Sequence, residues 1–543
     1  MQYRDKSSNR IVKLTDSPTA FLAVAEPGDA ESVATLAGQR VFSLNASTNE
    51  DGVYVLEAVS DAESPVEIAK AVEALRSSPG VHAVMPAQVD EAGETRYVLP
   101  GRLAVQFTDT PARDVRKLVR GLGGSIRRQF ESTGLYEVEV PEGTGIDEFI
   151  ETLNAEPQVA FAEPLYYGVN DANLKVSISV GGAGGDAEAV TAALGWNLER
   201  IEVSGAWAVT RGRDPIVVAV VDGMPETGHE AIAAKLAAPP ADAYVFTADR
   251  SISSHATNIA GIVAGESAQF IGAAPGIRVL PLIVNLNSQV YAERGAALRF
   301  AATCATQKRI GRTRIERLVL SCSWKTAGDL AVIRTALEEA VAAGVVVVCS
   351  AGNSGTTAIH FPSAYSNGPA ALADGVIAVA ATDRDDHLAS YSNHSPTVDL
   401  CAPGGDGLPI DARDVPCTEQ GNAYGFAAGT SISAPHVAAV AALMLSANPE
   451  LAPGDVKRLL AQSADPIDAL NPAYAGTLGS GRLNARRAVA AAGGPAAAET
   501  RPAEETPPAE TPPAGNGGQP AEGGGPRVTI SVGGGPRVRI STG

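Results

Sequence analysis

Ser431 is the residue of this sequence whose surroundings best suit covalent chemistry. It lies in residues 429–436, Gly-Thr-Ser-Ile-Ser-Ala-Pro-His, directly before the apolar run 437–445. A serine hydroxyl is a weak nucleophile at neutral pH, so it needs a neighbouring base and donors for the oxyanion formed on attack at a carbonyl. The start of a buried helix supplies backbone N–H groups and positive dipole. A Gly-Thr-Ser tripeptide alone indicates only a helix cap; the whole segment predicts a nucleophile.

Two residues upstream have the types needed to activate such a serine. The β-branched run 215–221 ends at Asp222, a pattern typical of a buried parallel strand that delivers one polar residue at its carboxyl end. His255 lies in the first turn of a predicted helix of small residues, 254–265, where close packing can hold an imidazole at the sheet edge. We predict that Asp222 orients His255 and that His255 is the general base. By contrast, we predict a structural role for His229.

A third apolar run suggests an oxyanion donor. Residues 344–350 form a predicted strand that leads into Ala351-Gly352-Asn353-Ser354-Gly355. A glycine-flanked amide can donate to an oxyanion, which nominates Asn353. The alternative is that Asn353 caps the segment that follows.

The order Asp222, His255, Asn353, Ser431 resembles that of the subtilisin-like serine proteases. The resemblance spans roughly residues 195–492. Its further motifs are residues 195–207, 272–275, 279–282, 320–324, 401–404 and 479–484. It implies a three-layer α/β domain with a mostly parallel sheet. It also implies a serine endopeptidase that hydrolyses peptide bonds through an Asp-His-Ser triad and an acyl-enzyme.

The resemblance also implies where protein or peptide substrates bind. The corresponding residues are Ser323, Trp324, Lys325, Ser350, Ala351, Gly352 and His360. Two of them depart from the family pattern: Lys325 stands where glycine is usual, and His360 lies near the expected floor of the specificity pocket. Their charge would favour acidic or polar residues at the cleaved position. The alternative is that both side chains point into solvent.

The region before the protease-like segment carries an internal repeat. Leu22, Tyr54 and Pro79 have counterparts in Leu103, Tyr136 and Pro157. Both copies predict strand, helix, strand, strand, helix, strand, as in small ferredoxin-like α+β domains, here residues 1–95 and 96–168. The second copy resembles subtilisin prodomains. The resemblance implies a self-processed zymogen whose own N-terminal domains act as an intramolecular inhibitor. The role of the first copy is not assigned.

Two segments have linker or tail composition. Residues 169–194 are rich in Gly, Ala, Asn and Asp and are the expected processing site, while residues 493–543 are rich in Pro, Glu, Ala and Gly and predict a disordered tail. Short β-branched stretches at 175–182, 527–534 and 537–541 echo one another. They either compete for one exposed sheet edge or share only a composition.

The composition limits which partners the protein can bind and where in the cell we expect it. The 543 residues are 45% hydrophobic with a formal charge of −19, which argues against nucleic acid and anionic membranes. No apolar run approaches the roughly 20 residues that span a bilayer, and no signal-peptide core is visible. We expect a cytoplasmic protein, with non-standard export left open.

No cofactor or metal is expected from the sequence. The five cysteines form no Cys-x-x-Cys pair, which predicts buried free thiols and not metal ligands. Residues 265–270 carry one carboxylate, Glu266, so a calcium cage is not indicated there.

The sequence also allows a second function from a different class. It is an inactive or self-inhibited protease fold that serves as a binding or regulatory module. Retention of full length after purification would favour it.

Overall fold

The computed structural model describes residues 1–25, 42–45, 53–58, 65–91, 93, 95–130, 133–167, 195–237, 244–286, 290–326, 328–407 and 413–493. Residues 1–497 belong to one compact unit. The first predicted helix of the N-terminal repeat, the predicted linker, its processing site and the predicted tail lie outside the described residues.

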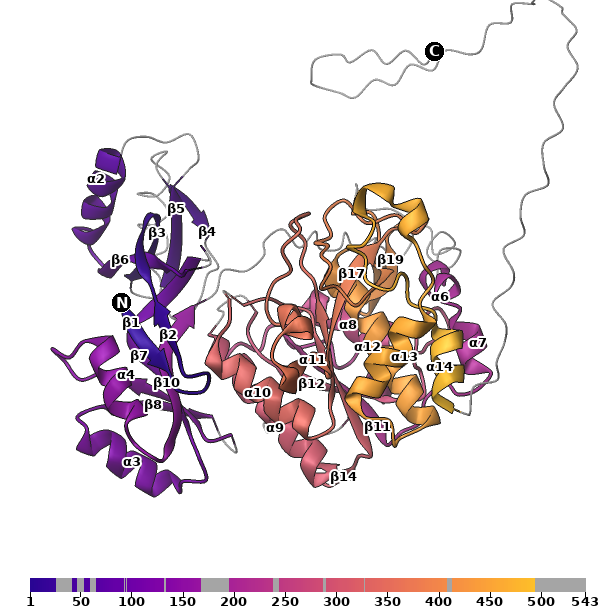
Figure 1. Ribbon diagram of the computed structural model, residues 1–543, viewed down its shortest axis with the longest axis horizontal. Coiled ribbons are helices and arrows are strands. Elements are labelled where there is room, and N and C mark those ends of the chain that lie inside the picture. Colours follow the sequence, from indigo (N-terminus) through magenta and orange to yellow (C-terminus); the bar gives the residue numbers. More distant parts are fainter. Residues whose placement is uncertain are drawn as a thin grey trace, which may run out of the picture. The chain divides into compact units, whose positions relative to one another are not determined.

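The centre of the protease-like region is a parallel sheet, as predicted. In the described residues its strand order is β12 (Arg278–Ile283), β11 (Ile216–Asp222), β15 (Arg317–Cys322), β16 (Val346–Ser350), β17 (Val376–Thr382) and β18 (Leu400–Pro403) (Figure 1). Every neighbouring pair is parallel. The chain builds outward from β11 to β12 and then crosses to β15 on the other side. Such a switch point opens a crevice at the carboxyl ends of the strands, where ligands bind in open α/β sheets.

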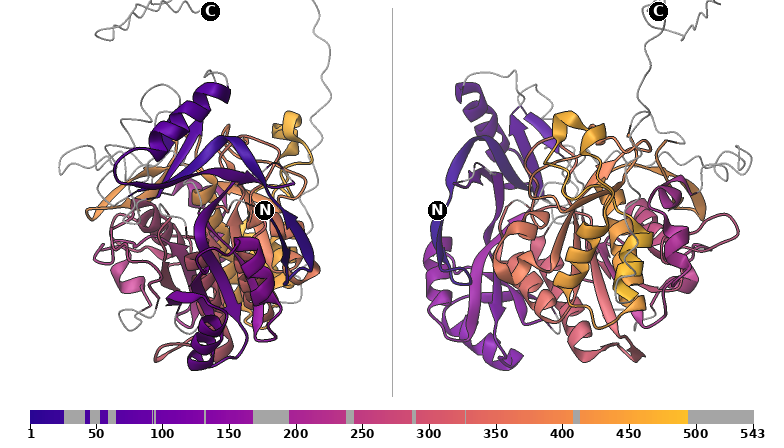
Figure 2. Two further views of the ribbon diagram at one scale, coloured as in Figure 1. Left: turned by 90° about the vertical axis from the view of Figure 1, so that its left-hand side faces the viewer. Right: turned by 45° about the vertical axis from the view of Figure 1, so that its right-hand side comes forward.

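Two apolar layers cover this sheet, so the predicted three-layer arrangement is confirmed. Alternate residues of β11 point to opposite faces: Val217, Ala219 and Val221 join one core, and their neighbours join the other. The first core contains α9 (Tyr291–Gln307) and α10 (Ala331–Ala342). The second contains α8 (Ser254–Ala264), α12 (Thr430–Ala447), α13 (Pro453–Ser463) and α14 (Ala485–Gly493). The orange and yellow helices α12, α13 and α14 lie side by side in Figure 1 and in the right-hand view of Figure 2.

The helix α12 is apolar on all sides because it runs through the core. Among the described residues, its length and hydropathy alone would let it cross a membrane, but 94% of that window is buried inside the protein. It packs on α8, on α14 and on five strands of the sheet. Its burial fixes the position of everything at its first turn.

Smaller elements complete this region. They are α6 (Trp196–Arg200), α7 (Val203–Trp207), η1 (Ala233–Lys235), β13 (Arg309–Ile310), β14 (Thr313–Arg314), η2 (Ser363–Asn367), α11 (Ala370–Ala373), β19 (Val415–Glu419), β20 (Ala423–Ala427), η3 (Asp468–Leu470) and η4 (Pro472–Tyr474).

The N-terminal repeats have the same strand order. The first contains β3 (Thr15–Ala25), β4 (Phe42–Asn45), β5 (Val53–Ala58), α2 (Pro65–Arg76) and β6 (Val81–Val89); the second contains β7 (Thr95–Phe107), α3 (Ala112–Gly121), β8 (Ser125–Phe130), β9 (Leu135–Glu139), α4 (Ile146–Asn154) and β10 (Val159–Tyr167). In each repeat the first strand lies between the third and the fourth, and the second strand is at the edge. This is the ferredoxin-like α+β arrangement that the pattern predicts.

The two repeats share one sheet, which the sequence does not predict. The division expected at residue 95 falls at the start of β7. Thr95 and Arg96 pair with β6 of the first repeat, while later residues of the same strand pair with β9 and β10. A hairpin of β1 (Gln2–Asp5) and β2 (Arg10–Lys13) precedes the repeats.

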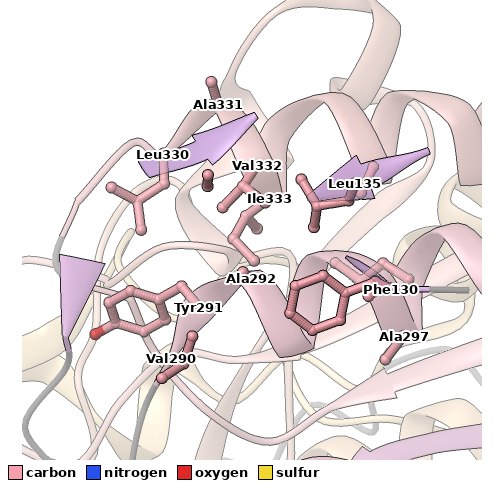
Figure 3. Packing of buried hydrophobic residues seen from close by; sticks show 14 of the residues in the cluster. Phe130, Leu135, Val290, Tyr291, Ala292, Ala297, Leu330, Ala331, Val332 and Ile333 are labelled. Carbon is pink, nitrogen blue, oxygen red and sulfur yellow. The ribbon is translucent and has the colours of Figure 1, made fainter. Parts of the chain in front are cut away.

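The sheet of the second repeat packs on α9 and α10. Phe130 and Leu135, at the β8–β9 turn, lie against Ala297 of α9 and Ile333 of α10 (Figure 3). The core on this face of the parallel sheet is therefore continuous with the core of the second repeat.

A close approach between α8 and β19 provides a stability prediction. A Cβ added at Gly261 would lie 2.1 Å from Oγ1 of Thr418, which itself donates a 2.6 Å hydrogen bond to the carbonyl of Thr257. We expect Gly261→Ala to lower the free energy of unfolding by about 1–3 kcal/mol, the usual effect of overpacking. Urea denaturation of full-length protein measures it.

The matched control is Gly228→Ala. A Cβ there meets no atom within 4 Å. Its urea midpoint should stay at the wild-type value, and equal midpoints for the two variants would contradict the predicted clash.

Candidate active site

Asp222 and His255 are in direct contact. Asp222 is the last residue of β11 and 1% exposed, and its Oδ2 accepts a 2.8 Å hydrogen bond from Nδ1 of His255. Its Oδ1 accepts the backbone N–H of Gly223 at 2.7 Å. Because a carboxylate only accepts, the imidazole proton lies on Nδ1 and Nε2 carries the lone pair.

The pKa of His255 reflects two opposing effects. Burial alone lowers the pKa, because it disfavours the charged imidazolium, but the charge of Asp222 and the hydrogen bond to it raise the pKa by more. The net result is a pKa above the ordinary value. The structure therefore favours proton uptake at His255.

Ser431 lies in the first turn of α12, and α12 packs on the helix that carries His255. Within the described part of the chain, Oγ of Ser431 and Nε2 of His255 are both buried and neither has a hydrogen-bond partner. One is a donor without an acceptor, and the other is an acceptor without a donor. Buried polar atoms are rarely left so unless a ligand or a reaction uses them.

Asn353 is held against the start of the same helix. Its Oδ1 accepts hydrogen bonds from the backbone N–H of Thr430 at 2.9 Å and from Oγ1 of Thr430 at 2.8 Å. The backbone N–H is an unambiguous donor, which fixes the amide orientation and leaves Nδ2 to donate elsewhere. Asn353 thus caps a segment, as its alternative interpretation holds, but the segment is the helix of Ser431.

Gly429 marks the space between these groups. A Cβ added there would lie 3.0 Å from Oγ of Ser431, 3.5 Å from Nδ2 of Asn353 and 3.7 Å from the backbone N of Ser431. One small region beside Gly429 therefore lies next to a hydroxyl and two N–H donors. The φ of +146° at Gly429 also disfavours any side chain.

The predicted substrate-binding residues lie at the carboxyl ends of β15 and β16. Ser323 follows β15, and its Oγ donates a 2.9 Å hydrogen bond to the carbonyl of Ser431. Trp324 is next and buried, and Lys325 is half-buried. The Ser323 contact ties this strand end to the first turn of α12, a link that the sequence does not reveal.

After β16 the chain turns sharply past Ser350, Ala351 and Gly352. The N–H of Gly352 donates to Oγ1 of Thr430 at 3.1 Å, and the carbonyl of Ala351 accepts from the backbone N–H of His360 at 3.3 Å. His360 is half-buried, and its ring lies so close to Gly352 that a Cβ there would be 2.5 Å from it. His360 therefore lies in this turn.

The other two buried histidines of the region have structural contacts. In His229, Nε2 donates to the carbonyl of Ala423 and Nδ1 accepts the N–H of Ala231. In His436, burial lowers the pKa to about 4, so it is neutral and bridges Asn197 and the carbonyl of Ile432. Neither has a ring nitrogen left for chemistry.

The other residues that could bind a metal ion are bonded to protein groups or lie apart from one another. All five cysteines are buried and free. Glu266 pairs with Lys235 at 2.5 Å and with Arg211 at 3.1 Å. In the part of the chain that the structure describes, no three His, Cys, Asp or Glu residues cluster as metal ligands would.

The hydrogen-bonded Asp222–His255 pair and the buried Ser431 are the residue types that hydrolases of the serine type use. Residues 213–496 match the Subtilase family, which is more than half of the chain. The chain belongs to this family of subtilisin-like serine proteases. Residues 83–164, which begin in the last strand of the first repeat and include nearly all of the second, match the fervidolysin N-terminal prodomain.

Two relatives of similar sequence agree with this family, and one solved structure is also similar. A thermophilic serine proteinase of Bacillus sp. (strain AK1) is 30% identical over 293 residues, which cover 52% of this chain and 64% of the relative. Thermitase of Thermoactinomyces vulgaris is 28% identical over 54% of this chain and 94% of its own length. The solved structure of a protease from Pseudoalteromonas arctica is 24% identical over 55% of this chain and 97% of that one, with a TM-score of 0.46.

The contacts of Ser431, His255 and Asn353 predict different losses of activity. Ser431→Ala and His255→Ala should each abolish nearly all peptide hydrolysis, and the double variant should be scarcely worse, because both disable one proton-coupled attack. Asn353→Ala should lower kcat by about 100- to 1000-fold. Peptide hydrolysis and labelling by a fluorophosphonate probe measure these effects.

Ser433→Ala is the matched control for the serine. It lies in the same buried helix, two residues further on, and its Oγ faces the carbonyl of Gly429 at 3.5 Å. It should keep both hydrolysis and labelling. Wild-type activity in Ser431→Ala would refute the assignment of the nucleophile.

The raised pKa of His255 predicts the pH profile. A general base must be neutral, so kcat/KM should fall as the pH decreases through the raised pKa, with a midpoint above 6.5. Asp222→Asn removes the charge that raises the pKa, so its residual activity should be lost only at lower pH. A wild-type midpoint below 6.5, or no shift in the variant, would contradict this account.

Proposed function

We propose that this chain is a serine endopeptidase, made as a precursor that its own N-terminal region inhibits. The observation that carries the proposal concerns two buried atoms without a hydrogen-bond partner among the described residues, Nε2 of the Asp-oriented His255 and Oγ of Ser431. The amide of Asn353, whose oxygen is bonded to Thr430, lies at the start of the same helix as Ser431. Protein and peptide chains are the proposed substrates.

In the proposed reaction, His255 Nε2 accepts the proton of Ser431 as Oγ attacks a peptide carbonyl. Asp222 holds the imidazole tautomer and stabilises the imidazolium. Nδ2 of Asn353 and the N–H of Ser431 donate to the oxyanion. His255 then protonates the leaving amine, and water hydrolyses the acyl-enzyme by the same steps in reverse. These steps use only protein groups and water.

Inhibition is supported by the contacts of the second repeat with α9 and α10. Glu163 of β10 is 2% exposed, and its carboxylate accepts the backbone N–H groups of Ala331 at 3.0 Å and Val332 at 2.7 Å. A helix start is a favourable place for a carboxylate. Burial, with the charge of Asp5 nearby, nevertheless raises the pKa of Glu163 to about 7.

Ion pairs add to this interface. Arg128 of β8 pairs with Glu293 of α9 at 3.0 Å and donates to the carbonyl of Phe246. Asp5, from the N-terminal hairpin, pairs with Arg334 of α10. Together with the Glu163 contacts, these pairs hold three separate strands of the N-terminal region, β1, β8 and β10, to the protease-like region.

The end of β10 reaches the residue that directly precedes α9. Tyr167, its last residue, forms an isolated antiparallel bridge with Val290, just before α9. The last described residue of the second repeat therefore also contacts the protease-like region, which supports an inhibitory role for this repeat.

The second candidate function is a non-catalytic binding or regulatory module. The many contacts between the N-terminal region and the protease-like region favour this second function if the N-terminal region is never released. The two functions differ in one observable, which is whether the chain cuts itself.

Self-processing between residues 168 and 194 is the expected outcome. Mass spectrometry of purified wild-type protein should find a new amino terminus in this stretch, because it joins the inhibitory region to the protease-like region. Ser431→Ala should remain uncut, and Ser433→Ala should be cut like wild type.

Two outcomes would change the proposal. If wild type is uncut yet hydrolyses peptides, residues 1–167 are a permanent part of the enzyme. If it is uncut and is not labelled by a fluorophosphonate, the binding-module function replaces the endopeptidase.

A further inference from the structure

Arg294 of α9 is a charged side chain buried without an ion-pair partner among the described residues. It is 2% exposed, and its Nε has no hydrogen-bond partner in the part of the chain that the structure describes. Among the described residues it has one long backbone contact, with Nη1 3.5 Å from the carbonyl of Lys325, and a side-chain hydrogen bond with the phenol of Tyr291. The adjacent carboxylate, Glu293, is engaged by Arg128 and by the N–H of Asn285.

Two other arginines of the same layer show how this protein normally buries a guanidinium. Arg299, on the same helix and also 2% exposed, pairs with Glu339 at 3.2 Å and donates to Oγ1 of Thr335 at 2.6 Å. Arg334 pairs with Asp5 and with Asp329. A buried charge is costly unless it is paired, so the state of Arg294 requires an explanation.

Aromatic rings hold the guanidinium in place. Its Cζ lies 4.9 Å from the ring centre of Tyr291 and 5.1 Å from that of Trp324. Cation–π contacts stabilise the charge but use none of its N–H groups. Trp324 contributes a second orphan, because its Nε1 is also buried without an acceptor among the described residues. Two N–H donors in adjacent side chains thus lack an acceptor.

The strand end that carries Trp324 is bonded to the first turn of α12. Trp324 follows Ser323, whose Oγ is bonded to the carbonyl of Ser431. Successive residues of an extended chain are about 3.3 Å apart, so Trp324 and Lys325 are within a few residues' length of the nucleophile. The charge of Asp222 acts on Arg294 as well. Arg294 is therefore within electrostatic reach of the catalytic groups.

We propose that Arg294 and Trp324 form a subsite for an acidic side chain of the peptide substrate, close to the bond that is cut. The inference rests on the proposed endopeptidase function and adds its substrate class. A carboxylate offers two acceptor oxygens and a negative charge, which match a planar guanidinium and a neighbouring indole N–H. An apolar side chain would leave both donors unpaired.

The test is a set of peptides of one sequence in which a single Asp, or Asn as its neutral isostere, is moved through each position around the cleaved bond. Wild-type enzyme should prefer Asp over Asn in kcat/KM at one position, by about 10- to 100-fold, as expected for hydrogen bonds to a charged group. Arg294→Met should abolish this ratio, and Arg294→Lys should keep part of it.

Arg299→Met is the matched control, because it removes a buried arginine of the same helix that already has a carboxylate partner. It should leave the Asp-to-Asn ratio at its wild-type value. A ratio near one at every position in wild type, or a preference that persists in Arg294→Met, would overturn the subsite.

Binding separates this inference from the proposed function. The same peptides, fluorescently labelled, are titrated into Ser431→Ala and into the double variant with Arg294→Met. Tighter binding of the Asp peptide that is lost with Arg294 supports the subsite, even if wild type hydrolyses nothing and the endopeptidase proposal fails. If the Asp peptide binds Ser431→Ala no better than the Asn peptide, the subsite is wrong.

Discussion

The parallel pairing of β11, β15 and β16 is the constraint on which the site depends. Parallel strands end on the same side of a sheet, so Asp222, Ser323 and the turn that carries Asn353 all emerge at one edge. The buried helix α12 begins at that edge and brings Ser431 to them. Packing of the apolar body of α12 and the hydrogen bonds of Thr430 and Ser431 together hold its first turn in place.

Much of this site was predictable from the sequence because polar residues that interrupt long apolar runs are conspicuous. Asp222 ends one such run, Asn353 follows another, and Ser431 precedes a third. What could not be predicted depends on contacts between distant segments. The capping of α10 by Glu163, the bond from Ser323 to Ser431 and the unpaired state of Arg294 leave no local pattern, since each is defined by a partner that folding supplies or withholds.

The hydrogen bonds between Thr430 and Asn353 fix the orientation of the Asn353 amide. The amide oxygen of Asn353 satisfies the N–H and the hydroxyl of Thr430, and Oγ1 of Thr430 accepts in turn from Gly352. With its oxygen occupied, the amide can present only its N–H₂ group to the space beside Gly429. The helix-capping bonds therefore fix the amide orientation that the proposed oxyanion contact requires.

The strand β7 couples the two N-terminal repeats. Its first residues pair with β6 and its later residues with β9 and β10, so the two repeats share backbone hydrogen bonds and not merely a linker. Local unfolding of the first repeat therefore removes hydrogen bonds from β7, the strand that also supports the face packed on α9 and α10. Under the proposed inhibition, the stability of the first repeat therefore contributes to how firmly the second repeat is held on α9 and α10.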